Sequence, residues 1–265
     1  MSFSKVGIVG TGIIGDALIE VLLRSGISKE SLLFIAEKRQ ERRDEIVKKY
    51  GVSEIKDYGS LDAILLAVKP QDFMATLESI SDSLSSSPLI VSFAAGIKIK
   101  SIEEKLGKGS RVIRVMPNTP MVMGRGMSAM SLGSSVNTSD QDWVKEFLSK
   151  AGEVIVVDES LQDAVTATSG SGPAYFFAFT EAVVGAARRL GISQEDAVTL
   201  ASQTLIGAAL MVEKSGKELK TLRENVTSPN GTTAAALKSF ADSGLEELVY
   251  QAMKAAHDRS IELSS

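Results

Sequence analysis

The chain has 265 residues, 44% of them hydrophobic, so it can bury a sizeable core, and its length favours two domains over one. Its 29 Lys and Arg and 33 Asp and Glu give a net charge of -4, with no basic stripe interleaved with aromatic residues, which argues against nucleic acid as a partner. Cysteine is absent and His257 is the single histidine, so a thiolate nucleophile, a zinc site and a Ser-His-Asp triad are poorly supported, and we expect no metal.

The first strand is predicted at Val6–Val9, after a short start that leaves no room for a signal peptide. Apolar runs further along, such as residues 61–68 and 174–179, are far shorter than the ~20 residues that span a bilayer. We therefore expect a cytoplasmic protein without a membrane segment.

A glycine-rich turn follows this strand directly and leads into a helical pattern at residues 17–24. In a dinucleotide-binding fingerprint, the first glycine permits the tight turn, the second lets the backbone approach a pyrophosphate, and the third allows close helix packing. An ordinary tight turn is the alternative, but the position between strand and helix favours the dinucleotide. The residues predicted to bind the cofactor here are Gly10, Thr11, Gly12, Ile13, Ile14 and Gly15.

Strands and helices then alternate along the first half. Strands are predicted at residues 32–36, 63–68, 89–92 and 111–115, and helices at residues 40–50, 71–84 and 101–106. This alternation is typical of a doubly wound, parallel α/β sheet of the Rossmann-like class, which binds its ligand at the carboxyl ends of the strands.

Loops after the later strands should therefore surround the nicotinamide half of a cofactor. An exposed loop charge and plain turn prolines are the alternative interpretation of the same residues. The loop residues predicted to bind the cofactor are Ala67, Val68, Lys69, Pro70, Ala95, Gly96 and Asn118.

The residues after the second strand bear on the choice of cofactor. Glu37, 22 residues after Gly15, stands where an acid would bind the ribose 2'-hydroxyl of NAD. Lys38 and Arg39 could instead hold the 2'-phosphate of NADP. We favour NADPH, with NADH as the alternative, and include all three residues in the cofactor site.

After a predicted strand at residues 126–132, a helix at 140–150 and a strand at 154–157, the pattern becomes helical, so we place a domain boundary at residue 158. Helices are predicted at residues 161–168, 174–190, 194–215, 232–241 and 246–263. Residues 174–190 and 197–212 are apolar over most of their circumference, which favours an obligate dimer with interlocked helices; one central helix in a monomer is the alternative.

Residues 227–233 break one helical pattern and begin another, presenting backbone N–H groups and hydroxyls at a helix start. Such a start attracts a carboxylate, although an ordinary helix cap has the same composition. Together with the glycine fingerprint, the turn indicates a dehydrogenase or reductase. We expect the turn to hold a substrate carboxylate; the residues expected to bind it are Ser228, Asn230, Gly231, Thr232 and Thr233.

Five motifs together resemble one family. They are residues 10–15, the Ala-Val-Lys-Pro at 67–70, the Met-Pro-Asn-Thr-Pro at 116–120, the Ser-Gly-Ser-Gly-Pro-Ala-Tyr at 169–175 and residues 225–233. Over its full length the chain resembles pyrroline-5-carboxylate reductase.

The resemblance implies reduction of the C=N bond of 1-pyrroline-5-carboxylate by NAD(P)H to give L-proline. It also implies an N-terminal Rossmann-like domain with an all-α dimerisation domain, at 1–158 and 159–265 here, in a dimer that often assembles as a pentamer of dimers. It places Asn225 against the cofactor across the subunit boundary and Ser171 and Gly172 near the pyrroline ring. For this substrate, Thr233 is the candidate catalytic residue, with its hydroxyl bonded to the ring nitrogen. The chain departs from the family pattern at Asn230, where glycine is usual, and at Glu37.

Three other functions compete with this one. A β-hydroxyacid dehydrogenase is disfavoured because Phe176 stands where such enzymes have a catalytic lysine. Reduction of another cyclic imine stays open. A non-catalytic NAD(P)-binding redox sensor also stays open, although it would not need the turn at residues 228–233.

Overall fold

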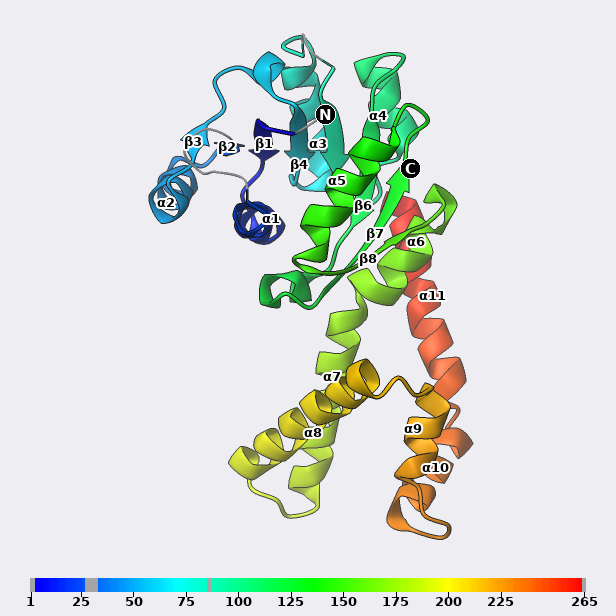
Figure 1. Ribbon diagram of the computed structural model, residues 1–265. Coiled ribbons are helices and arrows are strands. Elements are labelled where there is room, and N and C mark those ends of the chain that lie inside the picture. Colours follow the sequence, from blue (N-terminus) through cyan, green and yellow to red (C-terminus); the bar gives the residue numbers. More distant parts are fainter. Residues whose placement is uncertain (1–2, 27–32, 85–86, 264–265) are drawn as a thin grey trace. The chain divides into compact units, whose positions relative to one another are not determined.

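The structure is a computed structural model that describes residues 3–26, 33–84 and 87–263 (Figure 1). Backbone contacts divide it into two compact units. The sheet unit comprises Met1–Ser171 and Ala256–Ser265, and the helical unit comprises Gly172–Ala255. The domain boundary expected at residue 158 stays a prediction.

Within the described residues, eight strands form one sheet in the order β3-β2-β1-β4-β5-β6-β7-β8. The central strands are apolar without alternation, because helices cover both faces of the sheet; all four residues are buried in each of β1, β4 and β5. The strand bounds are β1 Val6–Val9, β2 Leu33–Ala36, β3 Ser53–Glu54, β4 Ala63–Leu66, β5 Leu89–Ser92, β6 Val112–Met116, β7 Gly126–Leu132 and β8 Gly152–Val156.

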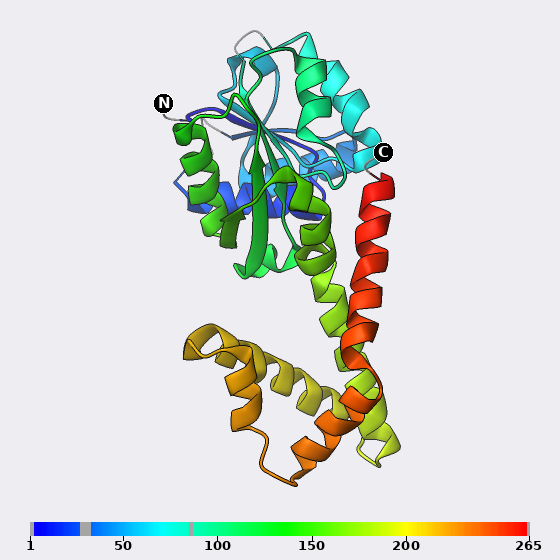
Figure 2. The same cartoon turned by 90° about the vertical axis from the view of Figure 1, so that its right-hand side faces the viewer.

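Helices lie on both faces of this sheet (Figures 1 and 2), and the buried apolar residues form two cores. Side chains of α1, α2 and α5 fill one core, and side chains of α3 and α4 fill the other. The helices are α1 Ile13–Arg24, α2 Gln40–Tyr50, α3 Pro70–Ser81, α4 Ile99–Leu106 and α5 Thr138–Ser149. The doubly wound class expected from the sequence is confirmed; position 32, expected to begin β2, lies outside the described residues.

One strand pair departs from the expected parallel arrangement. β7 runs antiparallel to β6, whereas the other strand pairs in the described residues are parallel. Residues 117–125 connect β6 to β7 through the 3-10 turn Thr119–Met123. A parallel crossover needs roughly a dozen residues or more, so this short connection reverses the chain.

The sheet unit ends in an irregular helical segment. After the 3-10 turn Glu159–Leu161, α6 Gln162–Val165 passes into a π-helical turn at Thr166–Gly170. The chain returns to this unit with the last part of α11, where the buried Ser260 donates its hydroxyl to Asp163 at 2.6 Å. Two segments distant in sequence therefore complete one unit.

The helical unit contains α7 Gly172–Arg189, α8 Gln194–Ser215, α9 Leu219–Asn225, α10 Thr232–Asp242 and the first part of α11 Leu245–Leu263 (Figure 2). The sequence did not predict α9. The rings of Phe179 in α7 and Phe240 in α10 lie 6.3 Å apart. Large apolar side chains nevertheless stay exposed along α7 and α8, including Phe176, Phe177 and Leu200.

Candidate active site

The glycine turn after β1 has the geometry that its sequence predicts. Gly10 has a φ of +89°, a backbone conformation that residues with a side chain rarely adopt, and it donates its N–H to the Ala36 carbonyl at 2.8 Å. A Cβ on Gly15 would lie 2.0 Å from the Gly10 carbonyl oxygen, so only glycine lets α1 approach this closely. A Cβ on Gly12, in contrast, would meet no described atom within 4 Å. The open side of the turn is therefore at Gly12.

The N-terminus of α1 lies at this open side. Its N-cap residue, Gly12, makes no side-chain capping bond, and the first helical hydrogen bond is from Asp16 N–H to the Gly12 carbonyl at 2.9 Å. The N–H groups of Ile13, Ile14 and Gly15 consequently have no partner within the helix. Uncapped N–H groups and the positive end of the helix dipole make this a site for phosphate.

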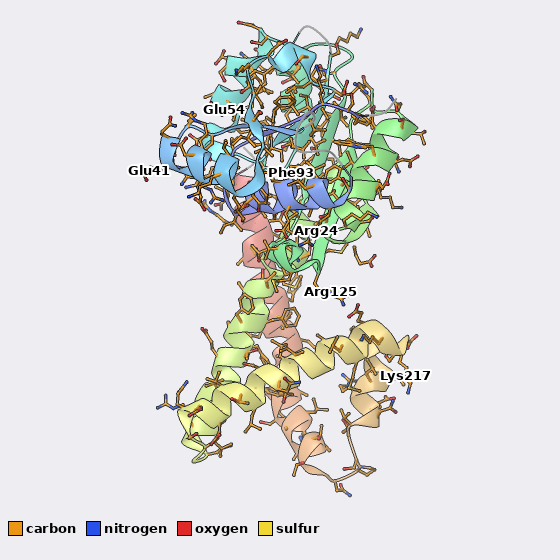
Figure 3. All side chains as sticks on the ribbon, turned by 60° about the vertical axis from the view of Figure 1, so that its left-hand side comes forward. Arg24, Glu41, Glu54, Phe93, Arg125 and Lys217 are labelled. Atoms are coloured by element: carbon orange, nitrogen blue, oxygen red, sulfur yellow. The ribbon has the colours of Figure 1, made fainter. Side chains whose placement is uncertain are left out.

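A cavity of about 1040 Å³ opens over the turn, at the carboxyl ends of β1, β2, β4 and β5. Glu54 and Phe93, both labelled in Figure 3, belong to its wall. Most of the predicted cofactor residues in the sheet unit line it: Gly10, Gly12, Ile13, Ile14, Glu37, Lys38, Arg39, Ala67, Val68, Lys69, Pro70 and Ala95. Thr11, which is fully buried, Gly15, Gly96 and Asn118 do not line it.

Several hydrogen bonds hold the carboxylate of Glu37 in this wall. Its Oε2 accepts hydrogen bonds from the N–H of Thr11 at 3.1 Å and from the Thr11 hydroxyl at 2.9 Å. Its Oε1 accepts from the N–H and Nε of Arg39 at 3.1 and 3.0 Å. Burial raises the pKa of this carboxyl, but the bonds from Arg39 and Thr11 outweigh burial and lower the pKa to about 2. Glu37 is therefore ionised at neutral pH.

The far wall of the cavity was missed by sequence reasoning. Ile55 and Tyr58 line it from the segment after β3, and Thr76 and Ser79 line it from α3. Burial raises the pKa of the Tyr58 hydroxyl. The two residues of β3 are too few to show a strand pattern, but Thr76 and Ser79 were detectable as polar positions three residues apart on a helix.

The side chain of Asn118 connects two segments of the sheet unit. Its Oδ1 accepts the N–H of Met127 at 2.8 Å, and its Nδ2 donates to the carbonyl of Ser169 at 3.1 Å. Each end of the side-chain amide thus has one protein partner, which fixes its orientation. The same bond holds the π-helical turn, in which Ser171 donates its N–H to the Thr166 carbonyl at 2.8 Å, just before Gly172.

In the helical unit, the predicted carboxylate-binding turn connects α9 to α10. Asn230 has a φ of +60°, the left-handed conformation that glycine adopts most easily. A Cβ on Gly231 would lie 2.3 Å from Ser228 Oγ, so this hydroxyl lies directly against the turn. Gly231 donates its own N–H to the Ser228 carbonyl at 3.0 Å and is therefore not a free donor.

The start of α10 is uncapped like that of α1. Its N-cap residue, Gly231, makes no side-chain capping bond, and Ala235 makes the first helical bond to the Gly231 carbonyl at 3.1 Å. The N–H groups of Thr232, Thr233 and Ala234 have no partner within the helix. Thr233 is half-buried, whereas Asn225, at the end of α9, is exposed.

Two further features of the described residues bear on function. Across residues 3–26, 33–84 and 87–263, no helix is long and apolar enough to cross a membrane. The same part of the chain holds no group of three or more His, Asp or Glu residues placed to bind a metal.

A doubly wound sheet with a glycine-rich, uncapped helix start facing a large cavity defines a dinucleotide-dependent oxidoreductase. Residues 5–96 match the family described as NADP oxidoreductase, coenzyme F420-dependent, and residues 159–263 match the family described as pyrroline-5-carboxylate reductase dimerisation. The chain belongs to the pyrroline-5-carboxylate reductase family, and the resemblance seen in the sequence is confirmed.

Full-length relatives support this assignment. A pyrroline-5-carboxylate reductase of Corynebacterium melassecola is 39% identical over 98% of each chain. The structure of the reductase from Coxiella burnetii is 33% identical, covers 100% of both chains and has a TM-score of 0.93. A pyrroline carboxylate reductase of Plasmodium falciparum, solved with NADP bound, is 31% identical with a TM-score of 0.85, again over 100% of both chains.

Proposed function

We propose that the protein reduces 1-pyrroline-5-carboxylate to L-proline by transfer of a hydride from NAD(P)H to the C=N bond. One observation carries this proposal. The chain, a member of this family, has two uncapped helix starts suited to anions, one at Gly12 and one at Gly231. One fits a dinucleotide pyrophosphate and the other a small carboxylate.

The residues of the sheet unit fit a nicotinamide dinucleotide. The N–H groups of Ile13 and Ile14 would hold the pyrophosphate, and Gly12 leaves the space for it. For the reductant we propose NADPH, with NADH also accepted. The relative from Plasmodium falciparum binds NADP, and the side chain of Arg39 here is 67% exposed in the wall of the cavity, where it can meet a phosphate.

The turn before α10 would hold the substrate by its carboxylate. The N–H groups of Thr232 and Thr233, which are among the donors without a partner in the helix, would bind it, and the Ser228 hydroxyl would supply a third hydrogen bond. Asn230 and Gly231 give the turn its shape. The Thr233 hydroxyl would then bond the ring nitrogen, which must receive a proton when the carbon receives hydride.

Orientation supplies much of the acceleration in this mechanism, because an imine already accepts hydride readily. The nicotinamide cofactor, when bound, supplies the hydride. Ser171 and Gly172, at the end of the π-helical turn, would border the pyrroline ring, and Asn225 would contact the cofactor of a neighbouring subunit. No metal, cysteine or histidine has a role in this scheme.

The protein acts on a small molecule as a homo-oligomer. We propose a dimer formed through the helical unit, since its apolar side chains are too exposed for a unit that faces water alone: Phe176 and Phe177 are each 62% exposed, and Leu190 is 85% exposed. The match to a dimerisation family over residues 159–263 supports this. Assembly as a pentamer of dimers and a cytoplasmic location stay predictions.

The test is oxidation of NADPH and of NADH by the purified protein with 1-pyrroline-5-carboxylate. Thr233→Ala should lower kcat/KM for the imine by about 100-fold and leave the Kd for NADPH nearly unchanged, because the hydroxyl acts on the substrate. Thr233→Ser, which keeps the hydroxyl, is the control and should retain most of the activity.

The outcomes separate the competing functions. Equal turnover by Thr233→Ala would remove this residue from the mechanism. Turnover of another cyclic imine alone would change the substrate, and cofactor binding without any turnover would favour the redox sensor.

A further inference from the structure

A cluster of polar side chains outside the cofactor cavity connects α2 to the glycine turn and to the start of α1, which lies beside it (Figure 1). Arg42, in the first turn of α2, donates from Nε to the Thr11 carbonyl at 2.9 Å and from Nη2 to Asp16 Oδ2 at 2.7 Å. Its side chain is 20% exposed and does not line the cavity. Arg42 therefore contacts the turn without facing the cofactor.

The contact with Thr11 determines how the middle of the turn is oriented. Thr11 is fully buried, and its N–H and hydroxyl both donate to Glu37, so Arg42 supplies the bond to the remaining main-chain group, the carbonyl. The peptide between Thr11 and Gly12 is trans, and a trans peptide is planar with its carbonyl and its N–H pointing in opposite directions. By holding the Thr11 carbonyl, Arg42 also fixes the direction of the Gly12 N–H, at the open side of the turn.

The contact with Asp16 fixes the helix start on the other side of Gly12. Asp16 donates its own N–H to the Gly12 carbonyl at 2.9 Å, and its Oδ1 accepts from the Tyr50 hydroxyl at 2.5 Å and from Lys49 at 3.2 Å. Burial raises the pKa of this carboxyl, but the bonds from Tyr50, Arg42 and Lys49 outweigh burial and lower the pKa. A lone carboxylate this close to the helix start would repel a phosphate, and the two cations compensate its charge.

The two neighbouring arginines have other partners. Arg39 pairs with Glu37, and Arg43 donates to the Glu37 carbonyl at 3.1 Å and pairs with Glu54 at 3.3 Å. Both line the cofactor cavity, whereas Arg42 does not. Of these three arginines, Arg42 is the one that contacts the turn itself.

We propose that Arg42 is a positioning residue of the cofactor site: by holding the Thr11 carbonyl and the Asp16 carboxylate together, it keeps the glycine turn and the start of α1 arranged to receive the pyrophosphate. This inference rests on the proposed function, in which the cavity binds a nicotinamide dinucleotide. Donors that are already in place lose less freedom when the ligand binds, so a fixed turn raises affinity. Both NADPH and NADH carry the pyrophosphate, so Arg42 contributes equally to both affinities and does not set the preference between them.

The experiment compares binding with turnover in the full-length protein. In Arg42→Gln, calorimetric titration should show the affinities for NADPH and for NADH each falling by about 10-fold, since charged hydrogen bonds are removed, with their ratio unchanged within about twofold. The KM for NADPH should rise correspondingly. The kcat with 1-pyrroline-5-carboxylate and saturating NADPH should stay within about twofold, because the pyrophosphate is remote from the carbon that gives up the hydride.

Lys48→Gln is the matched control, because Lys48 lies on the same helix, is exposed and does not line the cavity. It removes the same charge and should leave both affinities within about twofold, because an exposed charge contributes little. Arg42→Lys is a second test: it keeps the charge of the cluster but loses the planar fork of donors, and it should weaken both cofactors by at least about threefold. If Arg42→Gln does not fold, Arg42→Lys decides.

Three outcomes would overturn the proposal. The first is unchanged affinity for both cofactors, which would show that the turn does not depend on Arg42. The second is a loss confined to NADPH, which would place Arg42 against the 2'-phosphate instead. The third is a lower kcat with unchanged affinities. Failure of the wild type to bind either cofactor, or binding without turnover of the imine, would instead count against the proposed function.

Discussion

The glycine turn allows a paired test in which one added methyl group affects stability at one position and cofactor binding at the other. In Gly15→Ala the new Cβ would lie 2.0 Å from the Gly10 carbonyl oxygen, about 1.5 Å closer than the optimal separation of roughly 3.5 Å. The turn or α1 must shift, and we expect a loss of about 3 kcal/mol in the free energy of unfolding. In Gly12→Ala the methyl meets no described atom within 4 Å, and a φ of -66° suits alanine.

For Gly12→Ala we therefore expect the free energy of unfolding to stay within about 1 kcal/mol, because a poorer N-cap is offset by a less flexible unfolded chain. Its affinity for NADPH should fall by at least about 10-fold, because the methyl fills the space through which the pyrophosphate reaches the helix start. Urea unfolding without cofactor and calorimetric titration with NADPH measure the two effects separately. The reasoning is refuted if Gly15→Ala is as stable as the wild type, or if Gly12→Ala binds NADPH normally.

Three further predictions concern stability. The pKa of Glu37 falls from 4.5 to about 2 on folding, so the ionised carboxylate stabilises the folded protein by about 3 kcal/mol. This contribution is complete above pH 4.5 and is lost as the pH falls towards 2. The difference in free energy of unfolding between wild type and Glu37→Gln, measured in urea, should therefore narrow from about pH 6 to about pH 3, and a constant difference would contradict this. In the wild type, the buried guanidinium of Arg114 lies 3.2 Å from the carboxylate of Glu159. Glu159→Ala removes this partner and should lower the free energy of unfolding by about 3 kcal/mol. A loss below about 1 kcal/mol in urea unfolding would count against this prediction. Asn230 has a φ of +60°, so Asn230→Ala should lower the free energy of unfolding by about 1 kcal/mol. Asn230→Gly should change it by less than about 0.5 kcal/mol, because glycine adopts this φ easily. Thermal melts of both variants can check these values.

The sequence predicted those parts of the fold that local patterns determine. β1 and β5 have the expected bounds, because each is a short apolar run beside glycine or polar punctuation. α9 was missed because its seven residues carry only two apolar positions, too few to show a helical period. β3 was missed for the same reason of length.

The candidate site likewise has parts that local sequence patterns predict and parts that they do not. The cofactor fingerprint was predictable because two of its glycines, Gly10 and Gly15, answer local steric needs. The inward position of the Glu37 side chain could not be predicted, because it depends on hydrogen bonds donated by Thr11, which is 26 residues away along the chain. The internal bonds of Asn118 likewise depend on Met127 and on a π-helical turn that no sequence period indicates.

The discontinuity of the sheet unit also bears on how the chain acquires its structure during synthesis. Residues up to Ser171 leave the ribosome well before residue 256, and at ~5–20 residues per second the interval lasts several seconds. During that interval Asp163 lacks its Ser260 partner, and the nucleotide-binding half exists without its last helical segment. The nascent enzyme therefore completes its first unit only after its second has been translated, although the residues that line the cofactor cavity all precede the helical unit in the chain.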